Sequence, residues 1–161
     1  MAAKKFIVIK NIYILEILTE LSDEDHILTT KEIQSILLSR YNIRLNRNAV
    51  YSNIEMLKQV GYDISDYNEN GKGYYLAKRQ FDKGEILLLC NAIHASHFIS
   101  SKESDQLIKT LLKTQSKYDA KEFTDKVYLP NPQKVENETL MKNIKIISTA
   151  IKENRMIQFN Y

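Results

Sequence analysis

Apolar residues recur every three or four positions through the first sixty residues, and this spacing predicts three amphipathic helices. The first covers about residues 9–21, the second begins at Thr29 or Thr30, and the third covers about 46–60. Their apolar stripes are expected to face one another and form a common core. These stripes consist of Ile14, Ile17, Leu18 and Leu21; of Ile33, Ile36, Leu37 and Tyr41; and of Val50, Ile54 and Leu57.

Local signals indicate where these helices end and predict a hairpin after them. Asn46 is a good N-cap for the third helix, and Gly61 follows that helix as a C′ residue would. Around Thr29 the capping-box pattern is matched in part. The pair Asn70-Gly71 predicts a tight turn. The two arms of the hairpin would carry Tyr62, Ile64 and Tyr67 before the turn and Tyr74, Tyr75 and Leu76 after it.

A different pattern begins at Phe81. Residues 85–99 are apolar almost all round, which predicts a helix that is buried on several sides. Ser100 or Ser101 is expected to cap a second helix over 102–115. The apolar face of that helix would carry Leu107, Ile108, Leu111 and Leu112. Residues 117–129 are ambiguous and fit a short helix followed by extended chain.

The last part of the chain follows Pro130 and Pro132, which mark a clear break. A long helix is predicted over 136–154, and residues 156–161 alternate between apolar and polar as a strand would. A strand needs pairing partners, and no later strand follows, so we expect the natural protein to continue beyond this chain. The predicted helix has one apolar side, with Leu140, Ile144, Ile147 and Ile151.

Three helices followed by a hairpin describe a winged helix-turn-helix, a module that reads DNA. We therefore expect a mainly α fold with a small β-hairpin. The expected parts are a winged helix-turn-helix at 5–79, a helical linker or dimerisation segment at 80–129, and the start of a mostly β effector domain at 136–161. Between residues 42 and 54 there are two arginines and no acid, which suits a recognition helix in the major groove.

The residues expected to contact double-stranded DNA come from three places. Seven lie on or just before the third helix, two at the start of the second helix, where they would bind a phosphate, and one at the tip of the wing, about 63–78. Arg47, in the first turn, is expected to reach a base. The ten are Arg44, Asn46, Arg47, Asn48, Tyr51, Ser52, Lys58, Thr30, Lys31 and Lys72.

Each of these residues also has an ordinary structural explanation. The polar start of the third helix could be a solvated helix end, and it is the order of the elements around it that favours DNA. Lys72 at a hairpin tip serves solubility as readily as phosphate binding. Thr30 and Lys31 are explained equally well by plain capping. Tyr51 could stack on a base, although a buried ring with a wet hydroxyl is commoner.

Composition narrows the classes of protein that remain. The chain has 161 residues, of which 43% are hydrophobic and 27% are charged. No stretch approaches 18 uninterrupted apolar residues, so no membrane-spanning helix is predicted. A single cysteine excludes an internal disulfide framework and favours a reducing, cytoplasmic location. The net charge of +3 is a weak pointer to nucleic acid, and the local charge on the third helix is the better indication.

The sequence contains no clear catalytic motif and no convincing metal-binding motif. There is no glycine-rich phosphate loop and no nucleophile motif, so we expect neither catalysis nor a cofactor. Cys90, His94 and His97 have spacings that could place three ligands near a metal. Apolar packing of the cysteine and polar packing of the histidines is the favoured explanation, and no metal site is expected.

The whole chain resembles the N-terminal two thirds of a WYL-domain transcriptional regulator. The first similar segments are Val50-Tyr-Ser-Asn-Ile54 with Leu57 and Gly61, Gly73-Tyr-Tyr-Leu76, and Phe81 with Glu85-Ile-Leu-Leu88. The later ones are Ser96-His-Phe-Ile-Ser100 with Lys102 and Ser104, Asn131 with Lys134 and Asn137, and Ala150-Ile-Lys-Glu-Asn-Arg155 before Ile157-Gln-Phe-Asn-Tyr161. The chain has no Trp, and Ser52-Asn53 stands where the family commonly has Arg-Asp.

This resemblance implies a bacterial or phage regulator with a nucleotide or single-stranded nucleic acid as effector in the missing C-terminal domain. It leaves open the operator and the choice between activator and repressor. The apolar helix at 85–99 needs cover, which predicts a homodimer, or packing against the absent domain. The residues expected at a dimer interface are Leu88, Ile93, Leu107 and Leu111. A rival function is a winged helix that binds a protein partner and no DNA.

Overall fold

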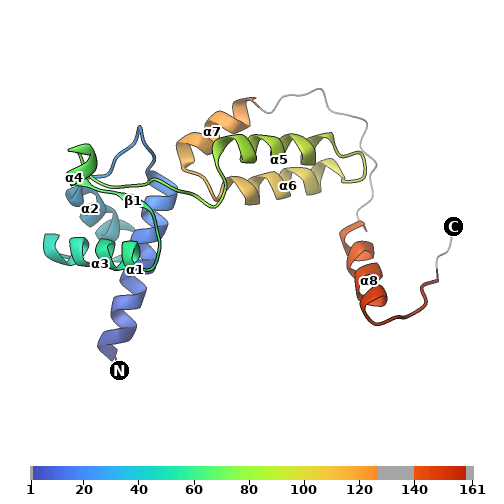
Figure 1. Ribbon diagram of the computed structural model, residues 1–161, viewed down its shortest axis with the longest axis horizontal. Helices are drawn as coiled ribbons and strands as arrows, with labels where there is room; N and C mark the ends of the chain where they lie inside the picture. Colours follow the sequence, from blue (N-terminus) through green and yellow to red (C-terminus); the bar gives the residue numbers. More distant parts are fainter. Residues whose placement is uncertain (1, 127–139, 159–161) are drawn as a thin grey trace.

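The computed structural model describes the backbone of residues 2–126 and 140–158, and the side chains of 10–124 and 142–158 (Figure 1). The fold is mainly helical with one small antiparallel sheet. In chain order the elements are α1 (Ala2–Leu21), α2 (Thr30–Tyr41), α3 (Arg47–Gln59), β1 (Ile64–Ser65), α4 (Tyr67–Asn70), β2 (Tyr75–Leu76), α5 (Lys83–Ala95), α6 (Ser101–Leu112), α7 (Lys117–Lys126) and α8 (Leu140–Lys152).

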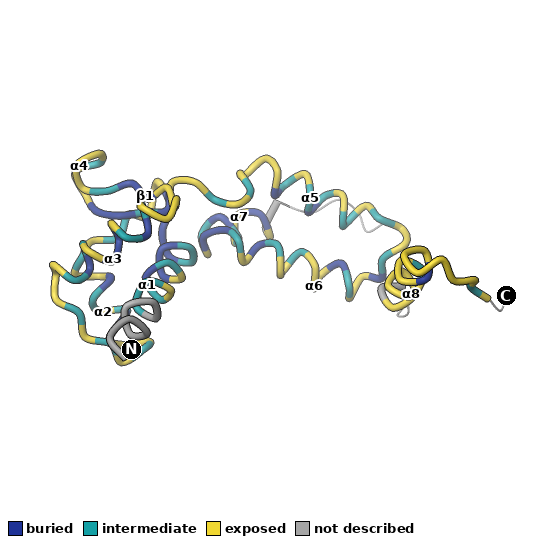
Figure 2. The backbone as a smooth tube through the Cα atoms, turned by 60° about the horizontal axis from the view of Figure 1, so that its bottom comes forward, coloured by how far each residue is buried: buried dark blue, intermediate teal, exposed yellow. Residues whose placement is uncertain are grey.

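The first hydrophobic core lies among α1, α2, α3 and the two strands, where Figure 2 shows the buried faces turned toward one another. The three predicted stripes are confirmed as the inward faces of these helices. Ile36 and Tyr41 are partly buried at the edge of the core, and Tyr41 stacks on Tyr13 with 4.0 Å between ring centroids. The fully buried residues of the stripes are Ile14, Ile17, Leu18, Ile33, Leu37, Val50 and Ile54.

Capping interactions set the ends of α2 and α3. Thr29 accepts a hydrogen bond from Glu32 N, and the Glu32 carboxylate accepts one from Thr29 N, so the capping box predicted in part is complete. The side chain of Asn46 accepts from Ala49 N at 2.8 Å, as an N-cap should. Gly61 follows α3 with φ +100°, a left-handed conformation that favours glycine.

The predicted hairpin is present, but its turn differs from the prediction. Strands β1 and β2 pair antiparallel, with Ile64 opposite Leu76. Between them the short helix α4 replaces the tight Asn-Gly turn, and Tyr67, expected on the first arm, lies in α4 and is 62% exposed. Asp66 caps α4 by accepting from Asn68 N, and Gly71 closes the helix with φ +69°. These local bonds favour a helical turn over a two-residue hairpin loop.

Leu28, in the loop between α1 and α2, pairs with Tyr74 beside the hairpin. Leu28 N donates to Tyr74 O at 2.9 Å, and Tyr74 N donates to Leu28 O at 2.8 Å. The chain comes so close there that a Cβ on Gly73 would lie 2.3 Å from the carbonyl oxygen of Leu28. Glycine is required at this position for close backbone approach and not for a turn.

Replacing Gly73 with alanine should therefore lower the free energy of unfolding by about 1–3 kcal/mol, because backbone must move to admit one methyl group. Chemical denaturation followed by circular dichroism measures the loss. Gly84→Ala is the matched control, since its Cβ would meet only the Asp82 side chain, at 3.3 Å. A Gly73→Ala protein as stable as the control would show that the Leu28–Tyr74 pairing does not form.

A second, smaller core lies among α5, α6 and α7. It contains Ile86, Cys90, Leu112 and Phe123, and α5 packs along α6. Helix α5 begins with a capping box between Asp82 and Glu85. It ends at Ala95 and not at residue 99, because Ser96 takes an extended conformation. Ser100 caps α6, as one of the two predicted candidates.

The expectation that α5 is buried on several sides is wrong for this chain. Ile86 and Cys90 face the second core, whereas Leu88 is 70% exposed on the opposite side. On α6, Leu107 is exposed instead of facing inward, while Leu111 packs against the second core and Leu112 is buried. Helices α5, α6 and α7 pack around one small core, which covers one side of each helix, so the remaining apolar residues of α5 and α6 face solvent.

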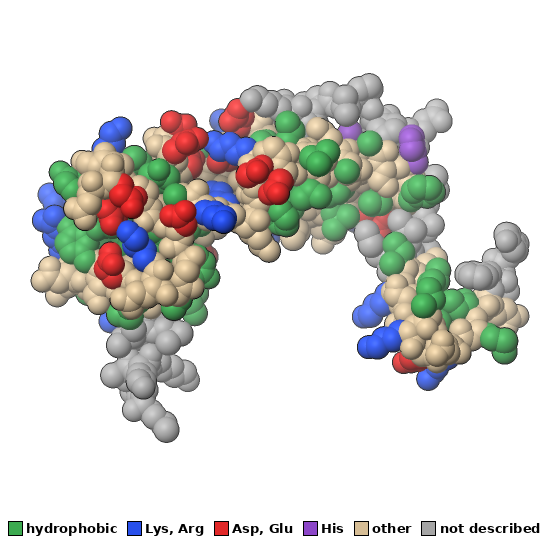
Figure 3. Space-filling view, in the orientation of Figure 1, with side chains coloured by type: hydrophobic (Ala, Val, Ile, Leu, Met, Phe, Trp, Pro, Cys, Tyr) green, Lys and Arg blue, Asp and Glu red, His purple; other side chains and the backbone are tan. Residues whose placement is uncertain are grey.

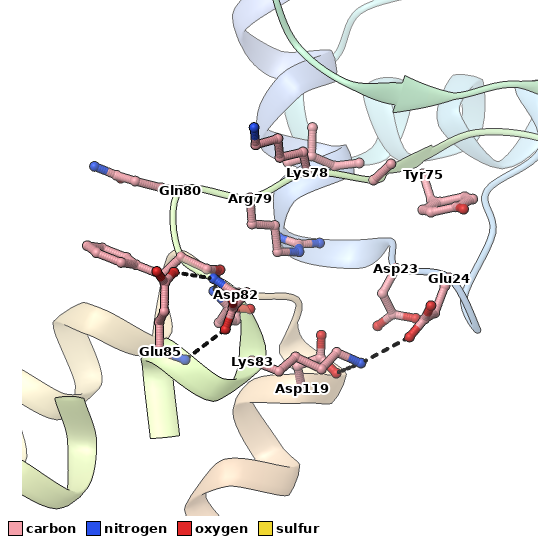
Figure 4. A pocket seen from close by; sticks show the side chains of 14 residues that line it. Asp23, Glu24, Tyr75, Lys78, Arg79, Gln80, Asp82, Lys83, Glu85 and Asp119 are labelled. Carbon is pink, nitrogen blue, oxygen red and sulfur yellow. Dashed lines mark hydrogen bonds and ion pairs between the residues drawn. The ribbon is translucent and has the colours of Figure 1, made fainter. Parts of the chain in front are cut away.

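Polar side chains join the two cores at a junction that includes Asp23, Arg79, Lys83 and Asp119 (Figure 4). Ser116 belongs to the same junction, because its hydroxyl donates to Asp23. Arg79 donates to Thr19 O at 2.8 Å and also to Ser22 O, which fixes the segment between β2 and α5 against the end of α1. Burial lowers the pKa of Arg79, while Asp119 and Asp23 act in the opposite direction. Lys83 at the start of α5 lies 3.0 Å from Asp119 and 3.5 Å from Glu24.

Helix α8 lies apart from both cores in Figure 1. Its predicted apolar side includes Ile144 and Ile151, both exposed, and Ile147, half-buried. Residues 136–139 of the predicted helix lie outside the described residues. Of the predicted strand at 156–161, residues 156–158 have no strand pairing, and 159–161 lie outside the described part.

Candidate nucleic-acid interface

A pocket with a volume of about 360 Å³ lies between the start of α2, the start of α3 and the segment after α4. We name it the basic pocket. Five of the ten predicted DNA contacts line it, namely Thr30, Lys31, Arg47, Tyr51 and Lys72. No Asp or Glu is among the lining residues, and Figure 3 shows Lys and Arg side chains at the outer edge of the N-terminal helices. The remaining lining residues are Thr29, Gln34, Tyr67, Gly73 and Tyr74.

The folding of the chain explains why Lys31, Arg47 and Lys72 line the same pocket. Lys31 lies in the first turn of α2, between Thr29 and Glu32, the two residues that form the capping box. Arg47 is the first residue of α3, immediately after its N-cap. Lys72 follows α4, where its N–H donates to the Asn70 side chain at 2.8 Å. The Leu28–Tyr74 pairing brings that segment beside the start of α2.

Tyr51 lines the basic pocket and contacts both Arg47 and Tyr74. Its hydroxyl accepts a hydrogen bond from Arg47 Nε, and the Arg47 guanidinium lies 5.2 Å from the centre of its ring. A hydrogen bond with Thr30 and a weaker effect of the hydrogen bond with Arg47 both lower the pKa of Tyr51. Its ring also tilts against Tyr74, 6.1 Å between centroids. Burial raises the pKa of Tyr74 to about 12.

Lys58 lies outside the basic pocket and already has a partner. Its Nζ is 2.8 Å from Asp66 Oδ2, and this hydrogen bond raises the pKa of Lys58 and lowers that of Asp66. The pair ties the end of α3 to the N-cap of α4. Lys58 therefore has a structural role that reasoning from helix spacing could not reveal.

The other predicted contacts are spread over the start of α3. The Asn46 side chain is used as the N-cap. Arg44, Asn48 and Ser52 are exposed and lie outside the basic pocket. Sequence reasoning did not anticipate Tyr67 and Gln34, which also line the pocket. Gln34 lies at i+4 from Thr30, a spacing that could have placed it on the same face of α2.

Asn53 faces inward, unlike its polar neighbours on α3. Its Nδ2 donates to Ala49 O at 2.5 Å, and its Oδ1 is buried without a hydrogen-bond partner. Asn53 is therefore a packing residue, whereas its neighbour Ser52 lies on the exposed surface of α3.

The remaining predicted sites can be placed as well. Cys90 is buried in the second core, and burial raises the pKa of its thiol. Across the described residues no group of three His, Cys, Asp or Glu side chains is arranged to hold a metal ion. Of the predicted interface residues, Leu88 and Leu107 are exposed, while Ile93 and Leu111 are half-buried.

Comparison with models of protein families, with curated proteins and with solved structures found no match. Among the described helices, none combines the length and the apolar character that crossing a membrane requires.

Proposed function

We propose that residues 5–79 form a winged helix-turn-helix that binds double-stranded DNA, with α3 in the major groove and the segment around α4 on the backbone. The order of elements supports this proposal: α1, the Leu28 bridge, α2, α3, and then the β1–β2 hairpin. The observation that carries it is the basic pocket. There Lys31, Arg47 and Lys72 come from three separate segments and line one pocket whose lining residues include no Asp or Glu. The nearest carboxylates border the pocket: Glu32 is bonded to Thr29, and Glu55 and Asp66 lie beside Arg47 and Tyr51.

Such convergence suits a phosphodiester better than an apolar partner. A DNA-binding protein gains most of its sequence-independent affinity by placing Lys and Arg against phosphates and releasing the counterions bound there. Contacts from several elements fix the orientation of the protein on the duplex. The hydroxyls of Thr30 and Tyr51 add groups that can donate to phosphate oxygens.

Changing Lys31, Arg47 and Lys72 together to glutamine should weaken binding to every duplex sequence. Each phosphate contact contributes roughly 0.9 to the slope of log affinity against log salt, so the slope should fall by about three units. Fluorescence anisotropy of labelled duplex DNA at several salt concentrations measures both quantities. The control removes three exposed lysines elsewhere, Lys102, Lys109 and Lys121, and should keep most of the slope.

Equal losses in the two triple variants would mean that net charge alone attracts DNA, and the basic pocket would then have no special role. Strong binding to a protein partner that is insensitive to salt, with no binding to DNA, would favour the rival function of a protein-interaction module.

The residues that resemble a WYL-domain regulator support two wider parts of this proposal. One is that the protein regulates transcription as a homodimer, with exposed Leu88 and Leu107 available to a second copy. The other is that the protein responds to an effector, a nucleotide or single-stranded nucleic acid.

A further inference from the structure

The polar residues of α3 form two separate rows on its surface. The outward row is Asn48, Ser52, Glu55 and Gln59, at i, i+4, i+7 and i+11, and all four are exposed. It lies opposite the buried side of the helix, which carries Val50, Asn53, Ile54 and Leu57. The outward row has no cation and includes one carboxylate. A carboxylate repels phosphates, so this row suits base edges better than the DNA backbone.

The flanking row is Arg47, Tyr51 and Lys58, at i, i+4 and i+11. These side chains turn toward the hairpin segment. Lys58 pairs with Asp66, Tyr51 packs on Tyr74, and Arg47 is bonded to the Tyr51 hydroxyl while it lines the basic pocket with Lys72. Arg47 is therefore held at the side of α3, beside two other cations, and away from the outward row.

We propose that Asn48 and Ser52 read base edges, and that Arg47, like Lys31 and Lys72, binds a phosphate of the DNA backbone. This inference rests on the proposed DNA-binding function and revises the sequence-based expectation that Arg47 reaches a base. An asparagine carboxamide matches the donor and acceptor of adenine N6 and N7, and a serine hydroxyl can bond to either kind of edge. The bond from Arg47 to Tyr51 holds the guanidinium in place before DNA arrives.

Selection of duplexes from a random pool, followed by affinity measurements on the selected sequence, separates the two roles. Arg47→Gln should leave the selected sequence unchanged, weaken all duplexes by a similar factor, and reduce the salt slope by about one unit. Arg47→Lys should restore that unit, because a phosphate accepts a point charge whereas bidentate base reading needs the guanidinium. Asn48→Ala should lose roughly tenfold preference at one base pair and keep the wild-type salt slope.

Two results would overturn the inference. One is an Arg47→Gln protein that selects a different base at a single position while its salt slope is unchanged. The other is salt-dependent binding without any selected sequence, since then no residue of α3 reads bases. If the wild-type protein binds no duplex at all, the proposed function itself fails, and this outcome is distinct from both.

Discussion

Truncating Ile54 to alanine should lower the free energy of unfolding by about 2–5 kcal/mol. Ile54 is fully buried on α3, in the core shared with α1 and α2. Removing its branched chain loses the transfer energy of those atoms and leaves a cavity that close-packed neighbours fill only in part. Small domains are stable by only about 5–15 kcal/mol, so this change should remove much of the stability of the part that contains the first core.

Substitutions that remove different amounts of buried side chain show whether lost packing explains the lower free energy of unfolding. Ile54→Val should cost about 0.5–1.5 kcal/mol, and Ile12→Ala, at a side chain 56% exposed, should cost much less than Ile54→Ala. Chemical denaturation with circular dichroism gives the three values. If Ile54→Ala and Ile12→Ala had equal effects, α3 would not pack through this face, and its outward row would have to be reassigned.

Removing the Asp23 carboxylate should be nearly as costly, about 2–4 kcal/mol. Asp23 is buried at the junction, where its Oδ2 accepts from Ser116 Oγ at 2.6 Å and its Oδ1 accepts from His26 N at 2.8 Å. Alanine would leave these donors without their charged acceptor, beside the stack of His26 on Tyr118. Asp25→Ala is the matched control, because that side chain is exposed two residues away.

The same carboxylate should make stability depend on pH. Burial acts to raise the pKa of Asp23, but hydrogen bonds from Ser116 and His26 outweigh it, and the net pKa lies below the ordinary 3.8. A lowered pKa in the folded state gives stability that is present above the ordinary value and is lost as pH falls below it. Between about pH 5 and about pH 3 the wild type should therefore lose more stability than Asp23→Asn. Parallel pH curves for the two proteins would contradict the role given to this carboxylate.

Features that depend on nearby residues were predictable from the sequence. The apolar stripes of α1, α2 and α3 follow from helical periodicity alone. Asn46 and Gly61 act within one turn of the helix end that they define. The candidate DNA contacts on α2, on α3 and near the hairpin tip could each be chosen because their side chains are cationic or can form hydrogen bonds.

Features that depend on distant contacts were not predictable in this way. No local pattern shows that Leu28 pairs with Tyr74, and this pairing is what brings Lys72 beside Lys31 and Arg47. The contact between Asp23 and Ser116 joins residues far apart in the chain. Even at short range, the Asn70-Gly71 signal fits both a hairpin turn and the end of a helical turn, and the cap at Asp66 decides between them.

Our central proposal is that this chain binds duplex DNA through the basic pocket and α3. The most direct test is the affinity of the wild-type chain for a pool of random duplexes, measured by anisotropy between about 50 and about 200 mM salt. We expect measurable binding at low salt that weakens steeply as salt rises, with a slope near that of three or more phosphate contacts. Absence of binding at the lowest salt, or binding that salt leaves unchanged, would contradict it.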